Sequence, residues 1–188
     1  MPEDAVVALA GRIGSGKSSI ADALAKRLGC GKASFGGYVR TVAADRGLEP
    51  TRVTLQQVGE ELITQDPYAF VKAVLARYGY RQGYSFVIEG IRHVSAISAL
   101  RELARPQIVL LVYLDTAEDQ RHERVIRRDG INETDLQVVE SHSTESQVKT
   151  LVARMADLVV DANSDPTKVV DVILKALSEK GSGVWGLG

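Results

Sequence analysis

Residues Gly11–Ser18 read GRIGSGKS, directly after the apolar run AVVALA of Ala5–Ala10 and before a stretch with helical periodicity. The pattern G-x-x-x-x-G-K-S has a mechanism, because small residues let successive backbone N–H groups curl toward phosphate oxygens. A helix that begins near Lys17 adds the partial positive charge of its N-terminus. The segment therefore predicts a phosphate-binding loop, and the alternative is a glycine-rich turn between a strand and a helix.

Each side chain of this loop has an expected role. Lys17 can reach the β- and γ-phosphates of a nucleotide, and the Ser18 hydroxyl can bind Mg²⁺. The expected cofactors are ATP and Mg²⁺. The residues expected to hold them are Gly11, Ile13, Gly14, Ser15, Gly16, Lys17, Ser18 and Ser19.

Composition limits the class of protein. The chain has 188 residues, 45% of them hydrophobic and 25% charged, which suits one globular domain. A net charge of -1 gives no general attraction for nucleic acid, so a polyanion must bind at a local site. Cys30 stands alone, which fits a reducing compartment. With no signal peptide and no membrane-spanning run in the sequence, we expect a cytoplasmic protein, monomeric or homodimeric, that binds neither membranes nor nucleic acid.

Strands and helices alternate along the chain. Near-continuous apolar runs predict buried parallel strands at Ala5–Ala10, Lys32–Phe35, Phe86–Glu89, Ile108–Leu114 and Leu158–Asp161. Helical patterns lie between them, and the Asp-Pro pairs at 66–67 and 165–166 predict helix starts. Such alternation predicts a doubly wound α/β sheet with its ligand site at the carboxyl ends of the strands.

Two arginines follow strand ends on that side of the sheet. Arg40 ends SFGGYVR after the second strand, and Arg92 ends VIEGIR after the third. Planar guanidinium groups suit a second phosphate, although solvated arginines are the alternative. Glu89 at the end of the third strand can hold Mg²⁺-bound water or accept a proton from the substrate, or it is simply neutralised by a neighbour.

A third group of arginines lies after the fourth strand. Arg124 and Arg128 are one helical turn apart and are candidates to cover a transferred phosphoryl group, whereas Arg121 and Arg127 are expected on a solvated face. Asp115 is expected to cap this helix. The stretch from Asp129 to Ser143 breaks the periodicity and predicts a small lid. The roles of His93, beside Arg92, and of His142 stay open.

Taken in order, these segments resemble the nucleoside monophosphate kinase superfamily, which includes adenylate and cytidylate kinases, phage-type deoxynucleotide kinases and dephospho-CoA kinases. The resemblance implies a five-stranded sheet of order 2-3-1-4-5 and one kinase domain over 1–180, with an acceptor-binding insert at about 36–80 and a lid at about 128–143. The tail at 181–188 is rich in glycine and is expected to be flexible. It implies that Arg40, Arg92, Gly36 and Gly37 bind the acceptor. It further implies that Lys17, Glu89, Arg124 and Arg128 are catalytic, with Ser18 and Glu89 at the metal.

Three functions remain in view. The first is transfer of the γ-phosphoryl group of ATP to a nucleoside or deoxynucleoside monophosphate. The second is the same chemistry on a hydroxyl, as in dephospho-CoA or another metabolite, where Glu89 would serve as base. The third is a nucleotide-dependent switch or assembly ATPase. No Gln stands after Arg92 where adenylate kinases read adenine, and Gly37 and Glu89 stand where relatives have Asp.

Overall fold

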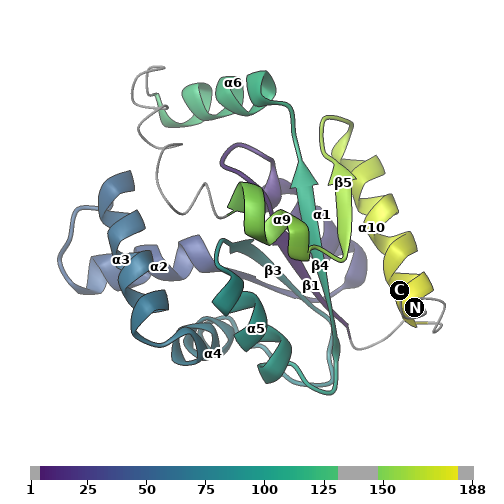
Figure 1. Cartoon of the computed structure of the whole chain (residues 1–188), viewed down its shortest axis with the longest axis horizontal. Helices are drawn as coiled ribbons and strands as arrows, with labels where there is room; N and C mark the ends of the chain where they lie inside the picture. Colours follow the sequence, from purple (N-terminus) through teal and green to yellow (C-terminus); the bar gives the residue numbers. More distant parts are fainter. Residues whose placement is uncertain (1–4, 131–147, 182–188) are drawn as a thin grey trace.

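The computed structural model describes residues 5–130 and 148–181. Its five strands form one parallel sheet of order β2-β3-β1-β4-β5 (Figure 1), which confirms the predicted fold class and strand order. The strands are β1 (Ala5–Ala10), β2 (Gly31–Ser34), β3 (Phe86–Ile91), β4 (Ile108–Asp115) and β5 (Leu158–Asp161).

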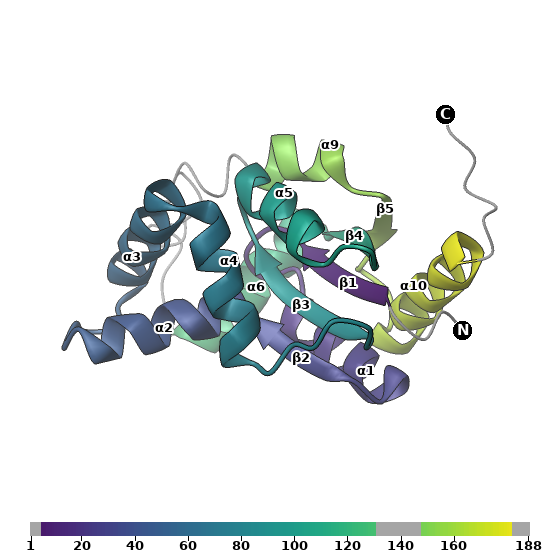
Figure 2. The ribbon, with the colours of Figure 1, turned by 90° about the horizontal axis from the view of Figure 1, so that it is seen from below.

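Helices cover both faces of this sheet (Figure 2). One face packs against α1 (Lys17–Leu28) and α10 (Pro166–Gly181), and the other against α4 (Pro67–Arg77), α5 (Val94–Leu103) and the short turns η1 (Val148–Val152) and α9 (Ala153–Met155). Alternate β1 residues serve the two cores: Val7 and Leu9 face α1 and α10, whereas Val6 and Ala8 face the opposite layer. Burial on both faces explains why the strands read as continuous apolar runs.

A helical lobe, α2 (Phe35–Asp45), α3 (Arg52–Gln65) and α4, is inserted between β2 and β3 (Figure 1). Side-chain caps fix where its helices begin. The Ser34 Oγ accepts a hydrogen bond from the Gly37 amide at 3.1 Å, and Asp66 Oδ1 accepts one from the Ala69 amide at 2.9 Å. The predicted helix start at 66–67 is confirmed. The prediction that Phe35 ends the second strand is wrong, because the Ser34 cap already starts α2 there.

The arginine-rich helix α6 (Glu118–Asp129) follows β4. The prediction that Asp115 caps it is wrong: Asp115 is the last residue of β4, and the cap position is held by the backbone of Ala117. Most of the expected lid, with His142, and the tail after Gly181 lie outside the described residues. Within residues 5–130 and 148–181, no helix is both long enough and apolar enough to span a bilayer.

Candidate active site

The loop between β1 and α1 needs its glycines. Gly14 has φ of +78°, and a Cβ there would lie 2.5 Å from the Arg121 carbonyl oxygen. Gly11 is equally constrained, since a Cβ would lie 2.6 Å from Ser15 Oγ. Backbone conformation and crowding both exclude a side chain at these positions. The glycine spacing of the motif therefore corresponds to a loop that is packed tightly on its outer side.

The start of α1 is prepared for an anion. Its N-cap residue is Gly16, which has no side chain to accept a hydrogen bond from the first turn. Lys17 is 9% exposed, and its Nζ donates to the carbonyl oxygens of Gly11 and Arg12, both at 2.7 Å, and to Ser15 Oγ at 3.2 Å. The ammonium group thus lies inside the curve of the loop, within reach of a bound phosphate.

Residues at the start of α6 hold the outer side of this loop. The Ile13 carbonyl accepts from Arg121 at 3.2 Å, the Gly14 carbonyl from Arg124 at 3.4 Å, and the Ser15 carbonyl from Thr116 at 3.5 Å. Across a trans peptide, the carbonyl of one residue and the N–H of the next point in opposite directions. Holding these carbonyls outward therefore turns amides such as those of Gly14 and Gly16 toward the cleft.

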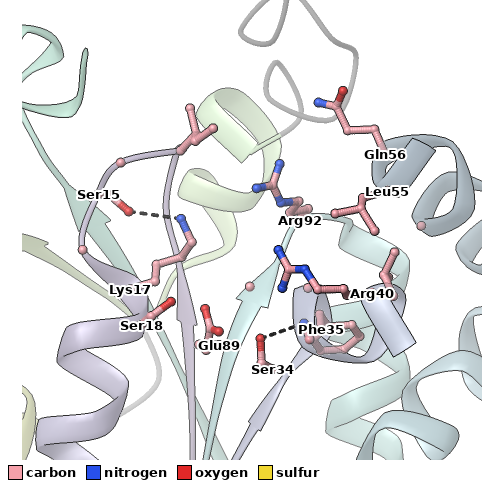
Figure 3. A pocket seen from close by; sticks show the side chains of 18 of the residues that line it. Ser15, Lys17, Ser18, Ser34, Phe35, Arg40, Leu55, Gln56, Glu89 and Arg92 are labelled. Atoms are coloured by element: carbon pink, nitrogen blue, oxygen red, sulfur yellow. Dashed lines mark hydrogen bonds between the residues drawn. The ribbon is translucent and has the colours of Figure 1, made fainter. Parts of the chain in front are cut away.

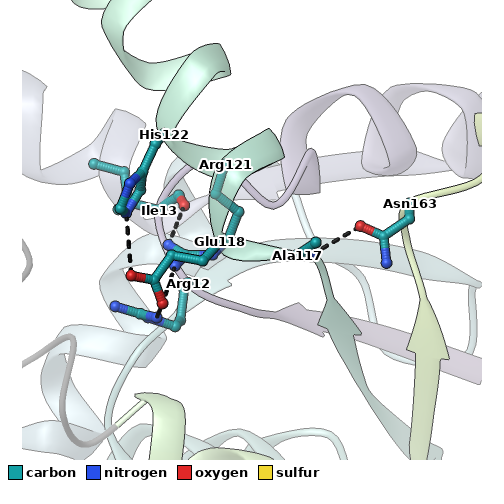
Figure 4. Close-up of polar contacts among 7 residues, drawn as sticks. All are labelled: Arg12, Ile13, Ala117, Glu118, Arg121, His122 and Asn163. Atoms are coloured by element: carbon teal, nitrogen blue, oxygen red, sulfur yellow. Dashed lines mark hydrogen bonds and ion pairs between the residues drawn. The ribbon is translucent and has the colours of Figure 1, made fainter.

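The prediction that Arg121 lies on a solvated face is wrong. Arg121 is 2% exposed and lies beneath the loop. Figure 4 shows Glu118 beside it, with Oε2 at 3.9 Å from Arg121 and 3.7 Å from Arg12, and Oε1 at 3.8 Å from His122 Nε2. Asn163 ties this corner to the sheet, because its Oδ1 accepts a hydrogen bond from the Ala117 amide at 2.8 Å. One carboxylate thus faces three basic side chains that join the loop to α6.

The opposite wall of the cleft belongs to the helical lobe. Figure 3 shows Arg40 from α2 and Arg92 from the segment after β3 directed into the same space, opposite Lys17 and Ser18. Glu89 lies on the floor between the two walls and is 7% exposed. The strand register explains its place: Glu89 pairs with Leu9 of β1 and Ser34 of β2, and the register then skips Gly90.

The cleft has a volume of about 1150 Å³. Besides Lys17, the described residues that line it include the arginines Arg40, Arg52, Arg92, Arg124, Arg127 and Arg128, and only two acidic side chains, Glu60 and Glu89. Among the described lining residues of this cleft, positive side chains therefore outnumber negative ones, although the whole chain has a net charge of -1. Such a cleft favours anionic ligands.

Gly37 is explained by a contact from another helix. A Cβ on Gly37 would collide with the Tyr78 hydroxyl, which lies at the end of α4. Aspartate at this position would therefore displace Tyr78. The departure from the family pattern at Gly37 follows from the packing of α4 against α2.

The predicted site residues come together in the structure. Every one of them lines the cleft except Gly11, which lies behind the loop and accepts from Lys17. Sequence reasoning missed Arg121 and Thr116, which hold the loop from outside, and the cleft residues Gln56 and Glu60 of α3. In the sequence, Glu60 and Glu61 are adjacent glutamates, and helical periodicity alone does not tell which of them faces the cleft. In the structure Glu61 pairs with Arg46 at 2.8 Å, outside the cleft.

The described groups with perturbed pKa values do not line the cleft. Backbone and side-chain hydrogen bonds from Thr167 lower the pKa of Asp165, which precedes the first residue of α10. Burial raises the pKa of the Cys30 thiol, against an opposing backbone hydrogen bond at Val87. A raised pKa favours the protonated thiol, and Cys30 packs against the core between the sheet, α1 and α10.

The donor set suits magnesium. The Ser18 hydroxyl and the Glu89 carboxylate offer hard oxygen ligands beside Lys17 (Figure 3). In the part of the chain that the structure describes, no group of three or more His, Cys, Asp or Glu side chains gathers as a metal cage. This pattern fits Mg²⁺, which usually takes one or two protein ligands and completes its shell with water and phosphate oxygens.

Comparison with known proteins gives a family. A family model described as an AAA domain matches residues 7–147. A UPF0200 protein of Aeropyrum pernix is 34% identical over 139 residues, which are 74% of this chain and 73% of that protein.

Solved structures share the fold. A gluconokinase from Sinorhizobium meliloti 1021 superposes with a TM-score of 0.66 and 18% identity over 98% of both chains. A shikimate kinase from Acinetobacter baumannii, in complex with shikimate, superposes with a TM-score of 0.63 and 15% identity over 95% of this chain and 96% of that one. The architecture is therefore that of a P-loop kinase.

Proposed function

The chain belongs to the AAA domain family and to the UPF0200 group, and from this premise we propose that it transfers the γ-phosphoryl group of Mg·ATP to a nucleoside or deoxynucleoside monophosphate. One observation carries the proposal: Arg40 and Arg92 face Lys17 and Ser18 across a single cleft. A donor phosphate on one side and an acceptor phosphate on the other would meet between them.

The role that we assign to each residue follows from its position in the cleft. Lys17 and the loop amides bind the β- and γ-phosphates of the donor, while Arg40 and Arg92 orient the acceptor phosphate through paired hydrogen bonds. Arg124 and Arg128, at the same cleft from α6, offset negative charge on the transferred group. Ser18 and Glu89 would hold a Mg²⁺ ion, which would supply positive charge to neutralise the phosphates. Catalysis is then mainly positioning and electrostatic stabilisation, because an acceptor phosphate is already a nucleophile.

A hydroxyl acceptor is the second candidate, and two observations favour it. Glu89 lies on the cleft floor, where it could take a proton from a hydroxyl. The structural relatives include a gluconokinase and a shikimate kinase. Against it stands the pair of arginines on the acceptor side, which suits a phosphate better than a neutral alcohol.

An ADP-release assay with Mg·ATP separates these candidates. Common ribo- and deoxynucleoside monophosphates, dephospho-CoA, gluconate and shikimate are offered one at a time, and ADP formation is compared with hydrolysis by water. Stimulation by a monophosphate supports the first candidate, and stimulation only by an alcohol substrate replaces it with the second. Stimulation by none of them would reject both, in favour of a nucleotide-dependent switch.

A further inference from the structure

The acceptor side of the cleft contains a carboxylate that the phosphoryl-transfer machinery does not use. Glu60 lies on α3 and lines the cleft with His93, which precedes α5. Its side chain as a whole is 41% exposed, yet its Oε2 atom is buried and has no hydrogen-bond partner among the described residues. The nearest basic atom, His93 Nε2, is 3.6 Å away, which is too long for a hydrogen bond.

A buried oxygen without a hydrogen-bond partner destabilises the fold unless a ligand supplies the missing donor. Buried polar atoms in folded proteins nearly always have a partner, and an unsatisfied one costs the free energy of its lost hydration. The cost is recovered if the partner is a ligand that enters the cleft. Because a carboxylate only accepts hydrogen bonds, that ligand must present a donor at this point.

The other side chains that line the cleft indicate what kind of molecule carries the hydrogen-bond donor. The described residues that line the cleft also include, from α2, α3, α4 and α5, the apolar side chains of Val39, Leu55, Ile63, Phe70 and Ala96. Phe70 is held at the edge of Phe35, with ring centroids 5.4 Å apart. Apolar and aromatic walls suit a flat ring with polar groups only at its rim, and they suit a polyol poorly because its hydroxyls would lose their hydration.

A nucleobase fits both requirements, and the carboxylate selects among the bases. Cytosine, adenine and guanine each carry an exocyclic amino group that donates. Uracil and thymine offer a carbonyl oxygen at C4, where cytosine carries its amino group, and a carboxylate repels that oxygen.

We propose that Glu60 determines base specificity: its buried oxygen accepts a hydrogen bond from an exocyclic amino group, so that the acceptor is an amino-bearing nucleoside monophosphate. This inference rests on the proposed function, because Arg40 and Arg92 must hold the acceptor phosphate for the base to reach α3. His93 lies beside the carboxylate and limits its orientations.

Matched pairs of substrates test the proposal. GMP and IMP differ only in the 2-amino group, so their ratio of kcat/KM isolates that group. CMP and UMP differ at C4, where an amino group replaces a carbonyl oxygen, and at N3, which carries a proton only in UMP. We expect the wild-type protein to favour the amino member of at least one pair by about 10- to 100-fold, the scale of one hydrogen bond to a charged group. A wild-type preference for UMP and IMP, or no preference in either pair, would overturn the proposal without any variant.

The variant Glu60→Gln keeps the shape of the side chain and adds a donor. It should reduce the preference at least 10-fold: in the CMP and UMP pair chiefly by lowering KM for UMP, because an amide can donate to the C4 carbonyl oxygen, and in the GMP and IMP pair by weakening the contact to the amino group of GMP. Glu61→Gln is the matched control: it removes a neighbouring charge on the same helix, outside the cleft, and should leave the ratio unchanged. Thermal melting of each variant checks that it is folded.

The assignment of Glu60 and the proposed phosphoryl transfer to monophosphates can be rejected separately. If monophosphates are phosphorylated but Glu60→Gln keeps the wild-type ratio, the assignment of Glu60 falls and the proposed function stands. If calorimetry detects no monophosphate binding and none is phosphorylated, the proposed function falls and the assignment with it. A changed ratio in Glu61→Gln as large as that in Glu60→Gln would also overturn the assignment, because it would show a general charge effect.

Discussion

The two walls of the cleft are constructed in opposite ways. The donor wall is one contiguous segment, residues 13–19, whose ligand-facing groups are backbone amides with the side chains of Lys17 and Ser18, and whose outer side is fixed by α6. The acceptor wall combines side chains from α2, α3 and the segment after β3, which are far apart in the sequence. A backbone site permits only one loop conformation, whereas a side-chain site can change its ligand by single substitutions. We therefore infer that the donor wall fixes the phosphate donor and that the acceptor wall sets the individual specificity of this chain.

The largest predicted effect tests the donor wall. Lys17→Ala removes the ammonium group from the curve of the loop and should lower kcat/KM for phosphoryl transfer by at least about 10³-fold. Steady-state ADP release measures it, with Lys26→Ala, an exposed lysine at the other end of α1, as control. Near-normal turnover in Lys17→Ala would show that the loop does not hold the reacting phosphate.

The next effect tests the acceptor wall alone. Arg92→Ala should lower kcat/KM for the acceptor by roughly 10²-fold, the scale of one charged phosphate contact, and leave ATP affinity nearly unchanged. Calorimetric titration with a non-hydrolysable ATP analogue measures the second quantity. Arg77→Ala, at an exposed position at the end of α4, is the control. Equal loss of ATP affinity would mean that the two walls do not divide the phosphates as described.

A smaller effect concerns the packing that shapes the acceptor wall. Gly37→Ala adds a methyl group where the Tyr78 hydroxyl lies and should lower the free energy of unfolding by about 1–2 kcal/mol. Removing that hydroxyl with Tyr78→Phe should recover part of the loss in the double variant. Denaturant unfolding of both single variants and the double variant measures the coupling. Additive losses would indicate that the two residues do not touch in solution.

The smallest effect concerns the outer side of the donor wall. Glu118→Gln weakens the contacts to Arg12, Arg121 and His122, but Glu118 is 64% exposed, so the loss should be only about 0.5–1 kcal/mol and should shrink in high salt. Thermal unfolding at two salt concentrations measures it against Asp119→Asn on the same turn. A salt-independent loss would point to packing instead of charge.

The same contrast explains which features could be predicted from the sequence. The strands, the loop and the helix start at Pro67 follow from local rules of burial, glycine spacing and capping, so they could be predicted. Arg40 and Arg92 were found because strand ends of a parallel sheet meet at one edge. Glu60 and Arg121 could not be found, because the environment of each depends on a distant element: His93 for the first, and the outer carbonyls of the loop for the second.

The concentration of positive charge in the cleft also has a kinetic consequence. A chain with net charge -1 does not attract anions from every direction, but a cleft lined with a lysine and six arginines focuses its field on its own mouth. Anionic substrates should be steered there during diffusion, and their association rate constants should fall as ionic strength rises. Products carry comparable charge, so the same field should slow their escape and make release a substantial part of the turnover time.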